Sequence, residues 1–245
     1  MEGQMAEAHE RSPGSLSHPC ERCSVRHRAM CAAVDFDHLG ALEQIVSHRQ
    51  FAPGQSIFDE SEPADYVYNI ANGDVRLYKL LADGRRQITG FLRSGDFLGL
   101  VKQDVYAYGA EAIDPVELCC MRIVDLERLL RELPAVRDRL LDMSRDELAA
   151  AQEQMLLLGR KSAREKVLSF LLLRAQHDHD LDEAQTVSLD LPMSRSDIAD
   201  YLGLTIETVS RTFTALKEEG LIDLPSAQHV VLPSLEAVEA AASAE

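Results

Sequence analysis

Short stretches in which apolar and polar residues alternate fill the chain from Phe51 to about Cys120. Turn dipeptides separate them at near-regular spacing, namely Pro53-Gly54, Asn72-Gly73, Asp83-Gly84 and Ser94-Gly95. Alternation with a period of two is typical of half-buried β-strands, and Asn-Gly and Asp-Gly favour tight hairpins. The pattern predicts a small antiparallel β-barrel or jelly roll over residues 51–123, within an α+β protein.

Between about residues 124 and 160 the apolar residues follow a helical spacing, which Pro134 divides into a short helix and a long one. The long helix carries a narrow apolar stripe that consists of Val136, Leu140, Met143, Leu148, Ala151, Met155 and Leu158. Such a stripe is typical of a dimerisation seam, so the sequence predicts a homodimer. Packing of the stripe on the chain's own barrel is the alternative.

Residues 161–245 show the pattern of a winged helix-turn-helix. Two short helices flank a tight turn at Gly203, and the second helix starts at Thr205. The other expected elements are an apolar helix around 167–172, a short strand at 187–191, and a hairpin that pairs 221–224 with 230–232. This arrangement would present the second helix to the major groove of DNA.

The second helix of this motif has two faces. Ile206, Val209, Phe213 and Leu216 recur at three- and four-residue steps and are expected to pack inward. Side chains that can read base edges lie opposite them. We therefore predict that double-stranded DNA is contacted through Thr205, Glu207, Ser210, Arg211, Thr214 and Arg195. An ordinary amphipathic helix pair is the alternative reading.

Composition limits the remaining possibilities. A chain of 245 residues with 46% hydrophobic residues is long enough for two domains. It contains no apolar run of about 18 residues and no secretory signal, which predicts a soluble cytoplasmic protein without membrane contact. The net charge of −16 argues against a general basic coat, so DNA binding would depend on a local patch. Residues 1–18 read as a flexible tail.

Residues 19–50 form a cysteine-containing segment followed by a short helix around His38–His48. Cys20, Cys23 and Cys31 lie within this segment, and a fourth thiol could come from Cys119 or Cys120. Cytoplasmic thiols at such spacing indicate metal binding, redox chemistry or burial. Four thiolates suit tetrahedral zinc or an iron–sulfur cluster, and His27 could replace one of them at zinc. Alternatively, nearby arginines could lower a thiol pKa and produce a redox switch.

Taken together, these motifs resemble the CRP/FNR family of transcription regulators, and within it the FNR/FixK/FnrN branch. The resemblance is carried by residues 20–31, 75–91, 95–99 and 194–213. Its most specific part is the reader motif Glu-x-x-Ser-Arg, which matches Glu207, Ser210 and Arg211. The family implies an inverted repeat of the form TTGAT-N4-ATCAA. Arg211 and Glu207 would read its G·C pair, and Ser210 a neighbouring thymine.

The resemblance also implies a cofactor. FNR-like members hold an oxygen-labile [4Fe-4S] cluster on three N-terminal cysteines and one cysteine at the end of the barrel. Cys20, Cys23 and Cys31 match the first three, and the helix that follows the barrel aligns best with Cys119 as the fourth, ahead of Cys120. The branch further implies an oxygen-responsive activator. Such an activator would form a homodimer and would have RNA polymerase as a further partner.

Cyclic AMP and catalysis are both disfavoured. Family members that bind cyclic AMP carry a glutamate after the Gly-Asp-Phe motif and a phosphate-binding arginine, whereas here Gly99 is followed by Leu100 and residues 107–110 supply no cation. The predicted barrel stretch 51–120 contains no histidine, which disfavours an enzyme with converging metal ligands. The sequence thus predicts a regulator that is not an enzyme.

Overall fold

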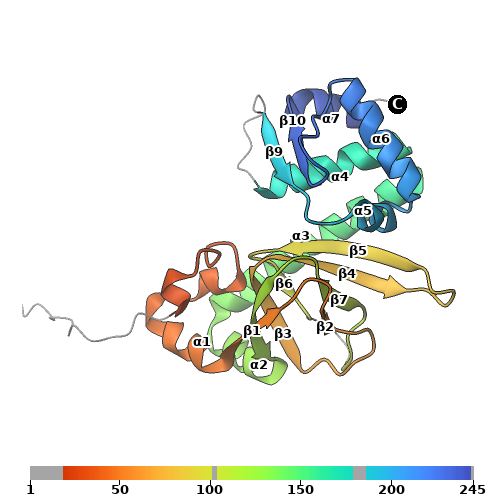
Figure 1. Ribbon diagram of the computed structural model, residues 1–245. Helices are drawn as coiled ribbons and strands as arrows, with labels where there is room; N and C mark the ends of the chain where they lie inside the picture. Colours follow the sequence, from red (N-terminus) through yellow and green to blue (C-terminus); the bar gives the residue numbers. More distant parts are fainter. Residues whose placement is uncertain (1–18, 101–103, 179–185, 244–245) are drawn as a thin grey trace, which may run out of the picture.

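The computed structural model describes residues 19–100, 104–178 and 186–243. It consists of a β-barrel, a long helix and a C-terminal helical domain with a small sheet (Figure 1). The tail expected over residues 1–18 lies outside the described residues. Within the described ranges, none of the helices has the length and apolar character needed to cross a membrane.

Two four-stranded antiparallel sheets form the barrel, with strand orders β1-β8-β3-β6 and β2-β7-β4-β5. The strands are β1 (Val46–Phe51), β2 (Ser56–Phe58), β3 (Tyr66–Asn72), β4 (Asp74–Leu80), β5 (Arg86–Arg93), β6 (Phe97–Leu98), β7 (Gly109–Ala112) and β8 (Val116–Arg122). Inward-facing side chains of both sheets, including Phe58, Ile70 and Leu118, share one core. The predicted barrel architecture is confirmed.

The turn between β3 and β4 shows why a glycine follows Asn72. Gly73 has a φ of +90°, and a Cβ there would lie 2.6 Å from the carbonyl oxygen of Pro115. Only glycine combines this backbone conformation with such a close approach.

The segment before the barrel differs from the prediction. It contains the 3-10 helices η1 (Pro19–Arg22), η2 (Met30–Ala33) and η3 (Phe36–His38), and then α1 (Leu39–Ile45). The helix expected around His38–His48 therefore ends at Ile45, and the barrel begins with β1 at Val46. Strand β1 lies at a sheet edge with only Val46 and Phe51 partly buried, so it shows no period-two pattern.

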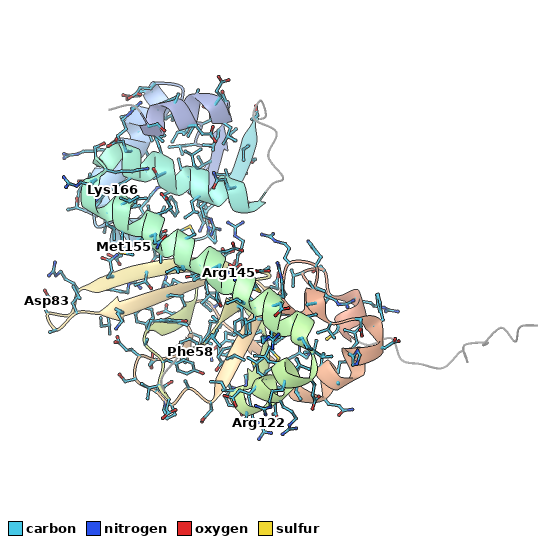
Figure 2. All side chains as sticks on the ribbon, turned by 180° about the vertical axis from the view of Figure 1, so that it is seen from behind. Phe58, Asp83, Arg122, Arg145, Met155 and Lys166 are labelled. Atoms are coloured by element: carbon cyan, nitrogen blue, oxygen red, sulfur yellow. The ribbon has the colours of Figure 1, made fainter. Side chains whose placement is uncertain are left out.

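Helix α2 (Ile123–Glu132) and helix α3 (Pro134–Arg160) are separated as predicted, with Pro134 in the first turn of α3. Figure 2 shows α3 running along the barrel toward the C-terminal domain, with Arg145 and Met155 along its length. The predicted apolar stripe is buried at the start of α3 and exposed further along, because α3 has two apolar faces.

The first residues of the stripe are covered by another segment of the same chain. Val136 and Leu140 are buried, and Met143 packs beside them, against Met30 of the cysteine segment in the same chain. Val136 and Leu140 are therefore covered by the chain itself, which argues against their place in a dimer seam, whereas Met143 is only partly buried and its dimer contact stays a prediction. Another face of α3 is exposed: Leu148 is 59% and Met155 is 65% accessible.

The C-terminal domain contains α4 (Ala163–Asp178), β9 (Val187–Asp190), α5 (Arg195–Leu202), α6 (Ile206–Glu218), β10 (His229–Leu232) and α7 (Leu235–Ser243). All of these elements contribute to one apolar core. Strand β10 pairs with β9, whereas residues 221–224 contribute only the isolated bridge Asp223–Val231. The hairpin predicted for 221–224 and 230–232 is thus reduced to one bridge, because Pro225 cannot donate to a longer ladder.

Candidate cysteine cluster and nucleic-acid interface

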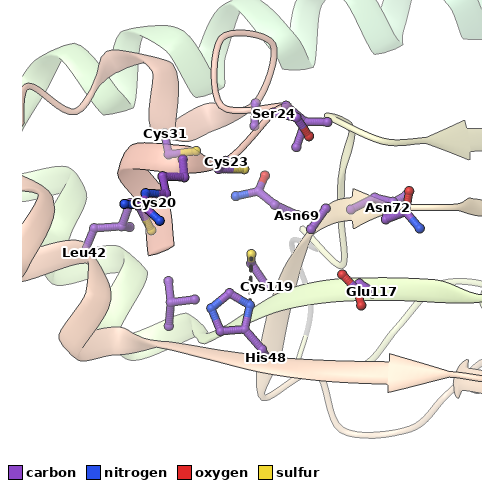
Figure 3. A pocket seen from close by; sticks show the side chains of 16 residues that line it. Cys20, Cys23, Ser24, Cys31, Leu42, His48, Asn69, Asn72, Glu117 and Cys119 are labelled. Atoms are coloured by element: carbon purple, nitrogen blue, oxygen red, sulfur yellow. Dashed lines mark hydrogen bonds between the residues drawn. The ribbon is translucent and has the colours of Figure 1, made fainter. Parts of the chain in front are cut away.

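A cavity of about 390 Å³ lies between the cysteine segment and the barrel. Its lining includes Cys20, Cys23, Cys31, His48, Asn69 and Cys119. Figure 3 shows the sulfur of Cys119 pointing from β8 toward the segment that carries the other three thiols. The structure thus gathers four of the five cysteines around one space.

Short turns hold the N-terminal thiols in place. Cys20 lies in η1 and Cys31 in η2, and Cys23 lies between η1 and the turn that begins at Ser24. The guanidinium of Arg26 donates to the carbonyl oxygen of Val34 and lies 4.8 Å from the centre of the Phe36 ring. These contacts fold the segment back on itself, so that cysteines up to eleven positions apart face the same cavity.

Cys119 has polar neighbours on both adjacent strands. In the sheet it stands opposite His48 of β1 and Asn69 of β3, and its Sγ lies 3.7 Å from Nδ1 of His48. Asn69 is buried, and no residue that the structure describes donates a hydrogen bond to its Oδ1. Sequence reasoning missed both neighbours, because it started the barrel after His48 and had no register for β3.

Cys120 faces the opposite way. It is 1% exposed within the barrel core, and its thiol points to the carbonyl oxygen of Leu118 at 3.8 Å. Successive side chains of a strand point to opposite faces, so Cys119 and Cys120 cannot both reach the cavity. His27, considered above as an alternative ligand, is exposed and is not among the residues that line this cavity.

Burial dominates the acid–base behaviour of the thiols. Desolvation, with the neighbouring thiols, raises the pKa of Cys31 to about 11 and that of Cys119 to about 12, and it also raises the pKa of Cys20. Arg26 opposes this shift at Cys20 and Cys31 but is outweighed. At Cys20, Cys31 and Cys119 burial therefore disfavours the thiolate that a redox switch needs, whereas a bound cation would replace the thiol protons.

The helix-turn-helix is formed by α5 and α6. Ser194 and Asp197 form a reciprocal capping box at the start of α5, and Gly203 ends that helix with a φ of +61°. Thr205 caps α6 by accepting a hydrogen bond from the backbone of Thr208. The predicted turn and helix start are both confirmed.

Helix α6 presents a polar face to solvent. Val209, Phe213 and Leu216 are buried, whereas Glu207, Ser210, Arg211 and Thr214 are exposed. Ile206 was expected to pack inward but is 47% exposed, because it lies in the first turn, at the edge of the apolar face.

Two of the predicted DNA-binding residues have structural contacts of their own. The guanidinium of Arg195 lies 3.6 Å from the centre of the Phe213 ring, and Arg195 is only partly exposed. Thr205 is engaged in the cap of α6. DNA contact by these two side chains stays a prediction.

Comparison with known proteins agrees with this architecture. Residues 48–132 match the cyclic nucleotide-binding domain, and residues 191–222 match the bacterial regulatory proteins of the crp family. The chain is 41% identical to the transcriptional activator protein FnrL of Cereibacter sphaeroides, over 89% of each chain. It is 43% identical to the nitrogen fixation regulation protein FixK of Bradyrhizobium diazoefficiens, over 84% of this chain and 86% of that one.

The solved structure of FixK2 from Bradyrhizobium japonicum superposes with a TM-score of 0.75 at 37% identity, covering 82% of this chain and 99% of FixK2. Similarity of this extent spans the barrel, the long helix and the helix-turn-helix together. The chain therefore belongs to the crp family of bacterial regulatory proteins, beside FnrL and FixK, and is a DNA-binding transcription regulator rather than an enzyme.

Proposed function

We propose that this regulator is an oxygen-responsive activator that carries a [4Fe-4S] cluster on Cys20, Cys23, Cys31 and Cys119. The observation that carries the proposal is the cavity lined by these four thiols, from which Cys120 is turned away. When bound, such a cluster supplies four iron–thiolate bonds and a centre that oxygen can dismantle.

The donor set and the size of the cavity support a cluster of several atoms. A single zinc ion requires four ligands within about 2.3 Å of one point. Across the described ranges, no three His, Cys, Asp or Glu side chains are placed so as to hold a single metal ion. Four thiols spread around about 390 Å³ suit a group whose own sulfides fill the centre.

Direct packing connects the cysteine segment to α3. Met30, one residue before Cys31, shares a core with Val136 and Leu140, and Nη2 of Arg139 donates to the carbonyl oxygen of Arg28 at 2.7 Å. Tying Cys31 to Cys119 would hold Met30 against α3. Release of the thiols would loosen this packing and, with it, the position of α3.

The exposed face of α3 supports a parallel homodimer. Leu141, Leu148 and Met155 are exposed and seven residues apart, which is the repeat of a coiled-coil seam, and Ala151 and Leu158 fall between and after them. Asp146, Glu147 and Glu153 place like charges along the same stretch of α3. Their repulsion would favour the monomer whenever the cysteine segment is loose.

DNA reading in this proposal uses Glu207, Ser210 and Arg211 on an inverted repeat of the form TTGAT-N4-ATCAA, one half-site per protomer, with RNA polymerase as the further partner. The barrel is proposed to work without cyclic AMP. Its interior is occupied by side chains, where the rings of Phe58 and Tyr106 stack with centroids 3.7 Å apart.

Metal analysis of protein purified without oxygen tests the cofactor. About four iron and four sulfide per chain, with a broad visible absorption that fades in air, is the expected result. Zinc with a featureless visible spectrum would contradict the cluster but would leave DNA binding untouched.

Zinc is the second candidate because of one contact. His48 stands beside Cys119, and imidazole with thiolates is a common zinc ligand set. The variant His48→Ala separates the two candidates: loss of bound zinc with no iron in either protein would support zinc, whereas unchanged iron content would support the cluster.

The dimer seam can be tested separately. Leu148→Glu should convert the anaerobic protein from dimer to monomer at micromolar concentration, because it places a charge at the centre of the seam. Analytical ultracentrifugation measures the change. Val124→Glu is the matched control, since Val124 is an equally exposed apolar residue on α2 and should leave the mass unchanged. A dimer that persists in Leu148→Glu would refute the seam.

A further inference from the structure

The barrel and the C-terminal domain meet where β4 and β5 lie beneath α5 (Figure 1). Arg76 of β4 and Arg86 of β5 both donate to Oδ1 of Asp197, at 3.1 and 2.7 Å. Arg86 also reaches Oδ2 of Asp200, one turn further along α5, at 3.0 Å. Arg76 is itself held by Glu111 of the neighbouring strand β7. We call Arg76, Arg86, Asp197 and Asp200 the interdomain joint.

The other end of α5 is held as well. Nε2 of Gln87 donates to the carbonyl oxygen of Asp200 at 2.7 Å, and Nε2 of Gln154 on α3 donates to that of Tyr201 at 2.9 Å. The last carbonyl groups of a helix have no partner within the helix, so these bonds satisfy groups that would otherwise need water. The Phe91 ring lies 5.2 Å from the Tyr201 ring. Contacts at both ends therefore prevent α5 from turning on the barrel.

Asp197 connects this joint to the helix-turn-helix. Its Oδ2 accepts from the backbone and side chain of Ser194 in the capping box, while its Oδ1 accepts from both arginines. Its side chain is only 5% exposed, so removal of a partner leaves a poorly solvated charge. Helix α6 follows α5 directly through Gly203 and must follow its orientation. None of the exposed side chains on the reading face takes part in the joint.

We propose that Arg76 and Arg86 are positioning residues that set which half-site spacing the dimer accepts. By fixing α5 to the barrel, they fix the distance and angle between the two reading helices. One added base pair rotates a half-site by about 35° around the duplex and shifts it along the axis, so a rigid joint should discriminate against it. This inference rests on the proposed two-fold reading of an inverted repeat.

Spacing preference in Arg86→Asp is the test. Fluorescence anisotropy on anaerobic full-length protein compares the N4 repeat, repeats one base pair longer or shorter, and a single half-site. We expect the wild type to prefer N4 by about tenfold or more. Arg86→Asp should lower that preference to about twofold while binding the single half-site normally. A purely structural role would change affinity for all probes alike and would not move their ratio.

Two further variants keep the result interpretable. Arg85→Asp is the matched control, because Arg85 lies on the same hairpin, is 77% exposed and pairs with Asp83 of its own turn. It should retain the preference. Combining Arg86→Asp with Asp200→Arg restores one opposite-charge pair between β5 and α5, although Asp197 then faces a carboxylate, and should recover part of the preference. A double variant that recovers none of it would overturn the inference.

Different results would contradict the proposed function and the inference about the interdomain joint. A wild type without any spacing preference contradicts the two-fold reading and, with it, this inference. A wild type with the preference, together with an Arg86→Asp variant that keeps it, overturns only the role of the joint.

Discussion

Cys119→Ser should reduce bound iron and sulfide from about four per chain to near background, and should weaken anaerobic DNA binding by about 10- to 100-fold. A serine hydroxyl does not ionise as a thiol does when it meets iron, and Cys119 is the thiol that the barrel contributes to the cavity. Without it, a cluster would no longer connect the thiols of the N-terminal segment to β8, and only apolar packing such as that of Met30 with Met121 would remain. Iron and sulfide assays with an anaerobic absorption spectrum measure the first effect, and anisotropy on the N4 repeat measures the second.

Cys120→Ser is the control, only one residue away. Its hydroxyl would enter the barrel core, where burial of a polar group costs roughly 1–3 kcal/mol of stability. The variant should melt at a lower temperature yet keep its full complement of iron. The opposite pair of results, with iron lost from Cys120→Ser and retained in Cys119→Ser, would refute the ligand assignment.

Arg211→Ala should produce the largest loss of sequence-specific DNA binding. A bidentate arginine–guanine contact contributes about 1–3 kcal/mol, and a dimer on two half-sites makes it twice. The expected weakening is therefore about 2–6 kcal/mol, or roughly 30-fold to 2 × 10⁴-fold in dissociation constant at fixed salt. Arg211 lies exposed on α6 and carries none of the packing of the domain, so the variant should fold normally.

The ratio of affinities between DNA probes tests the role of Arg211 more specifically than the overall loss of affinity does. Replacing the guanine of each half-site should weaken the wild type but have little further effect on Arg211→Ala. Lys217→Ala, at the exposed end of α6, is the comparison: it should weaken all probes alike and reduce the salt dependence of binding. If Arg211→Ala still distinguished the guanine as strongly as the wild type does, Arg211 would not be the residue that recognises this base.

Elements with a strong local pattern were predictable. The turn glycines, the break at Pro134 and the start of α6 at Thr205 follow from backbone conformations that few residues adopt. Edge strand β1 was not predictable, since only its ends are partly buried. The main partner of β10 was missed for a similar reason. Two short apolar segments could each pair with β10; it pairs along its length with β9 and forms only one bridge, at Asp223, with the predicted segment.

The apolar stripe of α3 shows a different limit. Helical spacing identifies apolar positions but does not say whether a neighbouring segment or a second chain covers them. Val136 and Leu140 turn inward to meet Met30, whereas Leu148 and Met155 stay exposed. The seven-residue spacing of Leu141, Leu148 and Met155 can be recognised only when it is known which face of α3 is buried.

By itself the sequence determined the barrel, the divided helix, the helix-turn-helix and the family, because each depends on local spacing and on residues with special backbone conformations. Only the tertiary structure decided that Cys119 and not Cys120 faces the other three thiols, since that depends on the register of β8 between β1 and β3. Only it revealed the pairing of Arg86 with Asp197. Residues so far apart in the chain meet through the folding of whole domains, which no local pattern encodes.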